Sequence, residues 1–438
     1  MSPDARVGVL VTEATLPDII VAGVDPACWR DGDAPGRRWL DTTVMPVAQA
    51  REVELAAAAL PHRGTLVHGG AAAGLAWWEA RGDAPVHAVY ADPPYNTGSA
   101  DQPYPDALPR DTWMSRFPQL LERAWSLLEP TGAMFCSIDD TLLFHLKLDM
   151  DRRLGEAAFL ASMPWIKRYS PAPDVRGIAY VHETVLAWRR SAAFRPGRLP
   201  PTAEKLRRYK NPDGDPAGRW KAMDYTCRYT RAERPNLWYP VHRPDGSEVW
   251  PSPTRVWSCS ADVHAANEAR GRVWWGKAGK NRMPALKKYL SEVPEGMPAA
   301  SVLHHEQVGH TDGAARALRA VLPDLKYTPK PTGLIRHLCA VAAVPPGCAV
   351  LDPFAGSGST GAAMLEAERM GEGQRPFLLI EHGPVFDRML VPRIARLTHA
   401  GRWDRGRPCS VDPLGVVHRV VRFDGQPVAG VGPSRRLP

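Results

Sequence analysis

The chain has 438 residues, 44% of them hydrophobic, which is enough for two or three domains with a sizeable core. Its 55 Lys and Arg outnumber its 47 Asp and Glu, and the formal charge of +8 suits a polyanionic partner such as a nucleic acid. We expect no membrane span, no signal peptide and no membrane partner, because long apolar runs are absent, and the seven cysteines without a C-x-x-C pair indicate a reducing, cytoplasmic compartment.

Residues 1–60 are punctuated by Pro, Gly and Asp and are taken as an N-terminal extension of unknown role. Regular patterning begins after them, and residues 61–164 form the first part of a predicted catalytic domain. The expected elements are a strand at Thr65–His68, a helix at Ala71–Ala80, a buried strand at Val86–Tyr90, a helix at Trp113–Leu128, a strand at Ala133–Ile138 and a helix at Asp139–Leu154. Alternating strands and helices predict a parallel α/β sheet.

This alternation is lost over residues 165–325, a region rich in Pro, Trp and Arg. Between Trp165 and Ala300 there are 25 Lys and Arg against 13 Asp and Glu, an excess of +12, and eight of the 15 tryptophans. The positive charge is therefore concentrated in one inserted region, although any single arginine or tryptophan there could equally serve a solvated face or a core.

The α/β pattern returns in residues 326–400, the second part of the catalytic domain. The expected elements are a helix at Leu334–Val344, a strand at Cys348–Leu351, a helix at Ala362–Arg369 and a strand at Pro376–Ile380. Residues 401–438 form a tail in which Val416–Phe423 and Gln426–Val431 flank Asp424-Gly425, a hairpin signal. The predicted fold is a doubly wound, mostly parallel Rossmann-like α/β sheet, split by the basic insertion.

A glycine-rich segment follows the strand that ends at Leu351. Gly356, Gly358 and Gly361 spell G-x-G-x-x-G between a strand and a helix, where backbone can approach a ligand closely. Glu381 comes 20 residues after Gly361, at a strand end, where a carboxylate can bind ribose hydroxyls. Alone, this pattern fits a dinucleotide site as well as a nucleoside site, so a nicotinamide oxidoreductase is one alternative.

The segment Asp92-Pro93-Pro94-Tyr95 directly follows the strand Val86–Tyr90. The Asp92 carboxylate and the Pro93 carbonyl could each accept a hydrogen of an aromatic amine, and the two prolines fix φ around them. Tyr95 offers a flat face on which an extruded base can stack. The alternative is a simple strand-terminating turn. The two motifs lie about 260 residues apart, but strands of an open parallel sheet can bring them together at their carboxyl ends.

With both motifs, the chain resembles the beta-class amino methyltransferases of DNA, and most of all adenine methyltransferases like the modification subunits of type III restriction systems. The matching segments cover about residues 62–400 and are Asp92 to Gly98 (DPPYNTG), Leu127 to Asp140 (LLEPTGAMFCSIDD), Gly271 to Leu290, Val308 to Leu322, Lys330-Pro331 and Leu351 to Gly361.

The resemblance implies transfer of a methyl group from S-adenosylmethionine to the N6 amine of a flipped-out adenine in duplex DNA. It assigns Asp92, Pro93, Pro94 and Tyr95 to the target base. It assigns to the cofactor Lys330, Asp352, Phe354, Gly356, Ser357, Gly358 and Glu381. It makes residues 165–325 the target-recognition region. It also brings a restriction subunit and a second copy of the chain as candidate partners, in the cytoplasm or nucleoid of a prokaryotic cell.

One departure bears on the cofactor: the family usually has Gly-Asp after the first strand, and here Gly70 stands in place of the acid that can bind the cofactor's adenine. Either another group substitutes or the cofactor binds weakly. The alternatives to an adenine enzyme are an N4-cytosine methyltransferase, whose members more often begin the motif with Ser, and a DNA-binding subunit without catalysis.

Two further patterns are set aside. Gly271 to Lys277 approximates a phosphate-binding loop but lacks the Ser or Thr that should follow it. His305-Glu306 and His310 approximate a zinc motif, but a spacing of five residues puts the two histidines on different helix faces. No metal is therefore expected.

Overall fold

The structure is a computed structural model that describes residues 62–423, except 83, 98–106, 171–175, 202, 294–295, 413 and 415, together with short strands at 5–10, 29–31 and 38–40. The chain divides into two compact units, one formed by Met1–Gly197 with Ala299–Pro438 and the other by Arg198–Pro298. Among the described residues, no helix is both long enough and apolar enough to cross a membrane.

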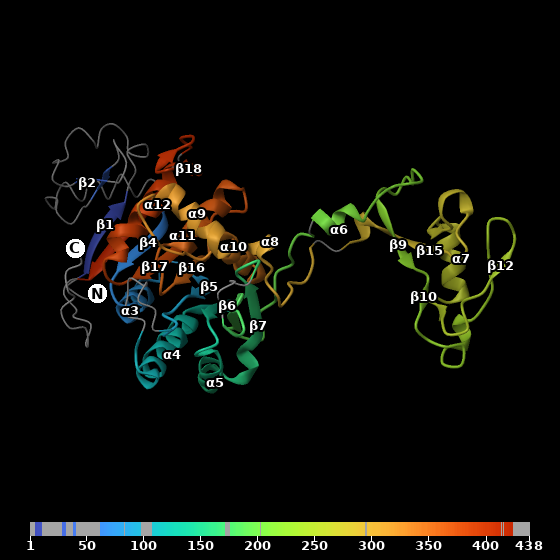
Figure 1. Cartoon of the computed structure of the whole chain (residues 1–438), viewed down its shortest axis with the longest axis horizontal. Coiled ribbons are helices and arrows are strands. Elements are labelled where there is room, and N and C mark those ends of the chain that lie inside the picture. The colour runs from blue at the N-terminus through green and yellow to red at the C-terminus, as the bar shows by residue number, and fades with distance from the viewer. Residues whose placement is uncertain are drawn as a thin grey trace. The chain divides into compact units, whose positions relative to one another are not determined.

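The first unit is built on a nine-stranded sheet with the order β1-β20-β4-β17-β16-β5-β6-β8-β7 (Figure 1). The six strands from β20 to β6 are mutually parallel, and the pairs at both edges are antiparallel. The strands are β1 (Ala5–Leu10), β4 (His62–His68), β5 (Val86–Ala91), β6 (Leu128–Ile138), β7 (Phe159–Ile166), β8 (His182–Arg189), β16 (Ala349–Asp352), β17 (Phe377–Glu381) and β20 (Val417–Phe423).

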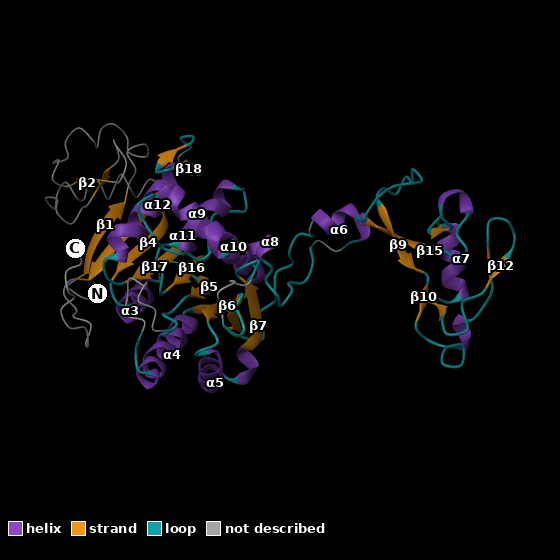
Figure 2. Ribbon diagram, in the orientation of Figure 1, coloured by secondary structure: helices purple, strands orange, loops and turns teal. Residues whose placement is uncertain are grey.

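Helices cover both faces of this sheet, with α3, α4 and α5 on one side and α9 to α12 on the other (Figure 2). Their bounds are α3 (Ala71–Arg81), α4 (Arg110–Ser126), α5 (Leu143–Leu154), α8 (His305–Val308), α9 (Thr311–Val321), α10 (Thr332–Val341), α11 (Ser359–Arg369) and α12 (Val391–His399). This arrangement confirms the predicted doubly wound, mostly parallel fold.

The central strand β5 is buried at all six positions, as a strand covered on both faces should be. Helix α4 packs Trp113, Phe117 and Leu121 into the same core, at the spacing expected of one helix face. Helix α5 begins at Leu143, later than the predicted Asp139, because the Asp139 carboxylate accepts the backbone N–H and the hydroxyl of Thr141 in a local turn.

The sheet continues past position 165, where the sequence analysis ended the first catalytic part. Strands β7 and β8 add an antiparallel pair to its edge, and α8 and α9 belong to the same unit. The expected insertion of 165–325 is therefore longer than the compact unit Arg198–Pro298. The sequence pattern could not reveal that the sheet continues, because antiparallel edge strands lack the alternation with helices that marks a parallel sheet.

The C-terminal strand β20 pairs with β4 on one side and with β1 on the other. Both of its edges are thus occupied by strands other than the predicted hairpin partner. The second arm of that hairpin, Gln426–Val431, lies outside the described residues.

The second unit contains small sheets around an aromatic core of Tyr225, Val241, Trp257 and Trp275. Its elements are α6 (Ala203–Arg207), β9 (Trp220–Asp224), β10 (Thr226–Cys227), β11 (Val241–His242), β12 (Glu248–Val249), β13 (Val256–Trp257), α7 (Ala261–Ala269), β14 (Val273–Trp274) and β15 (Ala285–Tyr289). It holds 19 Lys and Arg against 11 Asp and Glu, so its excess of +8 equals that of the whole chain.

Candidate functional site

The segment Asp92–Tyr95 leaves the carboxyl end of β5 and is held by contacts on both sides. The indole N–H of Trp113 donates to the Pro94 carbonyl oxygen at 2.7 Å. Asn96, with φ of 60°, exchanges two hydrogen bonds with the backbone of Leu108, at 2.8 and 2.6 Å. Hydrogen bonds to Trp113 of α4 and to Leu108, just before that helix, therefore fix the segment.

A cluster of charged side chains closes around Asp92 and Tyr95. The Lys330 ammonium lies 3.0 Å from Asp92 Oδ1, 2.9 Å from Glu183 Oε2 and 2.5 Å from the Tyr95 hydroxyl. That hydroxyl is 2.8 Å from Asp92 Oδ1 and 3.0 Å from Glu183 Oε2, and Lys167 Nζ donates to Glu183 Oε1 at 2.9 Å. We call these five residues the target-base cluster.

Burial and charge act in opposite directions within this cluster. Burial raises the pKa of Asp92, although Lys330 opposes the rise. The pKa of Glu183 falls to about 2 despite its burial, because two ammonium groups, Lys330 and Lys167, bind it. Burial opposes the charge of Lys330, but Asp92 and Glu183 hold its pKa well above the usual value. The cluster is thus two carboxylates balanced by two cations.

The cofactor loop begins at the carboxyl end of β16 and is held by hydrogen bonds to carboxylates. Asp352, only 2% exposed, accepts the Phe354 N–H at 3.1 Å and the Thr360 hydroxyl at 2.5 Å. Glu381 accepts the Gly356 N–H at 2.5 Å and the N–H of His382 at 2.9 Å. The Asp352 side chain therefore shapes the loop from within.

Within the part of the chain that the structure describes, Asp352 and Glu381 have no cationic partner of the kind found in the target-base cluster. Burial raises the pKa of Asp352 to about 7, opposed by the hydrogen bonds from Thr360 and Phe354. Burial also raises the pKa of Glu381 to about 7, opposed by the backbone N–H groups of Gly356 and His382. Both groups therefore titrate near neutral pH.

Two glycines allow the loop to turn into α11. Gly356 and Gly358 have φ of 50° and 77°, in the left-handed region that favours glycine. A Cβ at Gly356 would come within 3.1 Å of the Tyr327 hydroxyl. Tyr327 thus faces the loop. Burial raises the pKa of its hydroxyl, and the negative charges of Asp92 and Glu381 raise it further, so Tyr327 is close enough to both motifs to interact with their carboxylates.

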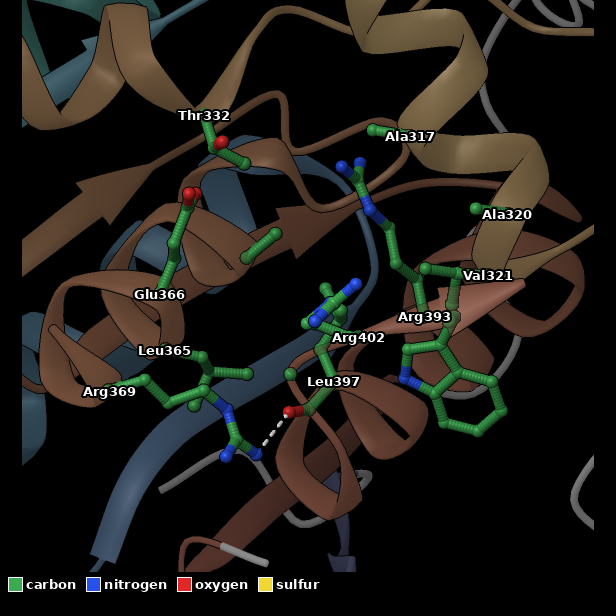
Figure 3. Close-up of a pocket in the computed structure, with 13 residues that line it drawn as sticks. Ala317, Ala320, Val321, Thr332, Leu365, Glu366, Arg369, Arg393, Leu397 and Arg402 are labelled. Atoms are coloured by element: carbon green, nitrogen blue, oxygen red, sulfur yellow. Dashed lines mark hydrogen bonds between the residues drawn. The ribbon is translucent and has the colours of Figure 1, made fainter. Parts of the chain in front are cut away.

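Behind the loop, Arg393 of α12 supports it through a buried guanidinium. Its Nη1 donates to the Ser357 carbonyl and hydroxyl, both at 3.1 Å, and burial lowers its pKa to about 10. Arg393 also lines a cavity of about 310 Å³ between α9, α11 and α12, where Arg369 bonds the Leu397 carbonyl (Figure 3). This cavity lies behind the cofactor loop and is lined by none of the target-base cluster.

The two motifs meet because β16 and β5 are adjacent parallel strands, with Leu351 opposite Val89. Lys330 connects the two sides: its ammonium contacts the target-base residues, while its carbonyl accepts the Ser359 hydroxyl at 2.9 Å. The resemblance assigned Lys330 to the cofactor, whereas its side chain joins the target-base cluster.

Glu183, Lys167, Tyr327 and Arg393 were not singled out from the sequence. They come from β8, the residue after β7, the segment before α10, and α12, and none of the motifs identified in the sequence includes them. One sequence feature could have pointed to Glu183. It is a carboxylate at the second position of the apolar strand β8, and a carboxylate in a buried strand needs a partner.

Gly70, the departure from the family pattern, caps the amino end of α3 with φ of −66°. The neighbouring Gly69 N–H donates to the Glu381 carbonyl at 3.0 Å, so this turn lies beside the cofactor loop. A Cβ at Gly70 would meet no atom within 4 Å. The position therefore has room for a side chain and a backbone that accepts one.

The fold and the site together define a class of protein, a doubly wound α/β protein that carries an Asp-Pro-Pro-Tyr segment and a glycine loop on adjacent strands. A family model described as DNA methylase (N6_N4_Mtase) matches residues 86–386. The chain belongs to this DNA methylase family.

Curated relatives are similar to the chain over about two thirds of its length. The Mod subunit of the type III restriction-modification enzyme StyLTI from Salmonella typhimurium is 26% identical over 324 residues, which are 67% of this chain and 48% of that protein. The type II methyltransferase M.KpnI from Klebsiella pneumoniae is 27% identical over 322 residues, 67% of this chain and 74% of that protein. The chain spans about half the length of the StyLTI subunit.

Two solved structures show partial similarity to the chain. The PvuII DNA methyltransferase, described as cytosine-N4-specific, is 13% identical, covers 77% of this chain and 87% of its own, and has a TM-score of 0.41. The M1.HpyAVI–SAM complex is 13% identical, covers 74% and 96% of the two chains, and has a TM-score of 0.34.

Proposed function

We propose that the chain transfers a methyl group from S-adenosylmethionine to the N6 amine of a flipped-out adenine in duplex DNA. The observation that carries this proposal is the adjacency of Asp92–Tyr95 and the glycine loop at the carboxyl ends of β5 and β16. Ligands of open α/β sheets bind at this edge. The Mod subunits among the relatives favour adenine as the target.

The described residues fit the cofactor. Glu381 would accept the ribose hydroxyls, since each of its oxygens accepts one backbone N–H and retains a further lone pair. The positive φ of Gly356 and Gly358 lets the loop backbone approach a ligand without side chains in the way. Phe354, which packs against Phe117, would line the pocket. When bound, S-adenosylmethionine supplies the reactive methyl group.

The target-base cluster would hold the amine. Both hydrogen-bonding contacts of the Asp92 carboxylate within the described structure go to Oδ1, from Tyr95 and Lys330, and we assign the amine hydrogen to Oδ2. The Pro93 carbonyl would accept the second hydrogen. Together the two acceptors orient the nitrogen, and the Tyr95 ring supports the extruded base by stacking.

The unit Arg198–Pro298 is proposed to recognise DNA, because it carries the whole positive excess of the chain. Cationic and aromatic side chains alternate on it: Arg231 lies 5.7 Å from the Trp238 ring and Arg234 lies 5.0 Å from the Tyr229 ring. A restriction subunit and a second copy of the chain are further proposed partners, and a prokaryotic cytoplasm or nucleoid is the proposed location.

The test is expression in a bacterial host that lacks DNA methylation, followed by single-molecule sequencing of its genome. We expect N6-methyladenine in one short, fixed sequence context. N4-methylcytosine would move the chain to cytosine, and scattered adenine marks would contradict a sequence-reading insertion. If the folded chain leaves no mark, independent activity is refuted and a missing partner or an inactive DNA-binding subunit is indicated.

A further inference from the structure

Three side chains with metal-binding atoms converge at the amino ends of central strands, whose carboxyl ends carry the proposed active site. His87, Glu129 and Cys348 each offer one ligand atom, and these atoms all lie within 4.8 Å of one another. They come from β5, β6 and the residue before β16, which are three adjacent strands. His87 precedes Asp92 by five residues, so about 16 Å of extended strand separates this group from the target-base cluster.

The His87 imidazole is the observation that points to a ligand. Its side chain is 6% exposed, and its Nδ1 has no hydrogen-bond partner among the residues that the structure describes. The nearest carboxylate oxygen, Glu129 Oε2, lies 3.8 Å away, beyond hydrogen-bonding distance. A buried polar atom without a partner is unfavourable, and a cation between the two groups would satisfy both of them.

The strand geometry aims His87 at this point. Against β16, the register passes from Val86 to Ala88 while β16 advances by a single residue, so His87 is the extra residue of a bulge on that side. Against β6, the register passes from Leu128 to Ala133 over the same step, so Glu129 also lies in an irregular stretch. Bulges redirect a side chain out of the regular pleat. On the other side, β6 passes close to the His87 carbonyl at Gly132, where a Cβ would come within 2.7 Å of that oxygen.

We propose that His87 Nδ1, Glu129 and the Cys348 thiolate bind a zinc ion that ties together the amino ends of three central strands. An imidazole, a carboxylate and a thiolate are ligands that zinc prefers, at about 2.0–2.3 Å in tetrahedral geometry. Such a geometry separates ligand atoms by roughly 3.5 Å, so the three side chains need to close by about 1 Å. Glu129 is 41% exposed, which leaves a path for the ion and a water as fourth ligand.

The three residues lie far apart in the sequence and show no ligand-spacing motif, so local sequence patterns could not predict this site. The site is separate from methyl transfer. Its role would be structural: a strand-bridging ion stabilises the folded state by its binding free energy.

The experiment uses the full chain without a polyhistidine tag, stripped of metal with a chelator and titrated with Co²⁺ and with Zn²⁺. We expect one equivalent of Co²⁺ to bind with a thiolate-to-cobalt charge-transfer absorption, and Zn²⁺ to raise the melting temperature. Cys348→Ser should lose the absorption, while Cys409→Ser, at an exposed cysteine, should keep it. No thiolate absorption in the unmodified chain, or its persistence in Cys348→Ser, would overturn the proposal.

Histidine and glutamate variants complete the test. Glu129→Gln, at a half-exposed side chain that folding should tolerate, should keep the thiolate absorption but weaken Co²⁺ binding by about tenfold or more. His87→Gln should weaken it at least as much. Unchanged Co²⁺ affinity in Glu129→Gln would remove this residue from the site and leave fewer ligands than zinc requires, which contradicts the proposal.

Discussion

The two halves of the proposed active site hold their carboxylates by different means. In the target-base cluster, Asp92 and Glu183 are balanced by the ammonium groups of Lys167 and Lys330. Beside the cofactor loop, the Glu381 carboxylate accepts two backbone N–H groups and no side-chain cation from the described residues. The first half is therefore charged and the second can be neutralised near neutral pH.

This difference gives the two halves opposite responses to pH. The pKa of Glu183 is lower in the fold than in the unfolded chain, so its stabilising contribution is full above about pH 4.3 and is lost as the pH falls towards about 2. The pKa of Glu381 is raised to about 7, so its ionisation opposes folding as the pH rises towards neutrality. Glu183 in the target-base cluster therefore stays ionised around neutral pH, whereas Glu381 beside the cofactor loop changes its charge there.

The largest expected effect comes from removing the acceptor of the charged half. Asp92→Ala should lower the rate of methyl transfer by about a hundredfold to a thousandfold or more, because an oriented electrostatic contact to the reacting group is lost. DNA affinity should survive, since the excess charge lies in Arg198–Pro298. Radiolabelled methyl transfer and gel-shift affinity are measured on the same protein.

Asp139→Ala is the matched control. This carboxylate follows the carboxyl end of the next strand, β6, and its hydrogen bonds to described residues all stay within its own turn, from Thr141. It should retain most of the activity. Turnover near that of the unmodified chain in Asp92→Ala would defeat the assignment of Asp92 to the amine.

Glu183→Gln tests whether the charge balance itself matters. It keeps the shape of the side chain but leaves Lys330 and Lys167 with one fewer buried counter-charge. We expect a loss of about tenfold in kcat, and of about 3 kcal/mol in the free energy of unfolding at neutral pH. This stability difference should vanish as the pH falls from about 4.3 towards 2, because Glu183 is then protonated in both states.

Chemical denaturation over a pH series measures this difference. Glu156→Gln, which replaces an exposed carboxylate in the short helix Glu156–Ala158, outside both proposed sites, controls for the loss of one negative charge. A Glu183→Gln chain as stable as the original at neutral pH would show that the two lysines do not depend on Glu183.

The sequence predicted the half of the site that is written in local motifs. Asp92–Tyr95 and the loop through Gly356 and Gly358 could be placed at strand ends, because prolines and glycines restrict or extend the backbone conformations available at those positions. The strands and helices of the parallel sheet could also be predicted locally, because buried strands and amphipathic helices have distinct hydrophobic periods.

The other half depends on tertiary contacts. Glu183 and Lys330 are 147 residues apart, and Glu183 enters the site only because β8 pairs antiparallel with β6. No local spacing encodes such a contact. The edge strand β8 and the last two residues of β7 were likewise assigned to the insertion, because antiparallel edge strands do not alternate with helices.

A smaller effect is expected in the cofactor half. Because Glu381 has a pKa of about 7, affinity for S-adenosylmethionine should rise as the pH increases through neutrality, by about tenfold from one unit below the pKa to one unit above. The ionised carboxylate accepts ribose hydroxyls better than the acid does. Isothermal calorimetry across this range gives the profile.

Glu381→Gln should bind the cofactor more weakly and flatten this profile. One oxygen becomes an NH₂ group, which must face the backbone N–H of Gly356 or His382 and repels it. A residual slope in the variant would be assigned to Asp352, which titrates in the same range. An unchanged profile in Glu381→Gln would contradict the role given to Glu381.

The smallest expected effect concerns Gly70, where the family usually carries an acid. Gly70→Asp should bind S-adenosylmethionine more tightly, by a few-fold and about tenfold at most, because one added hydrogen bond contributes about 0.5–1.5 kcal/mol. A side chain fits there, since a Cβ meets no atom within 4 Å and φ is −66°.

Gly70→Ala separates this hydrogen bond from the effect of stiffening the backbone, because it adds a Cβ without an acceptor. Aspartate at Gly70 would also cap the amino end of α3, so its melting temperature can rise even if its affinity does not. Calorimetric affinity is therefore the deciding measurement. Tighter binding in Gly70→Asp but not in Gly70→Ala would show that the unmodified chain lacks a hydrogen-bond acceptor for the cofactor's adenine at this position. Equal affinity in all three chains would show that another group already binds the cofactor's adenine, and no binding in any of them would support a DNA-binding subunit without catalysis.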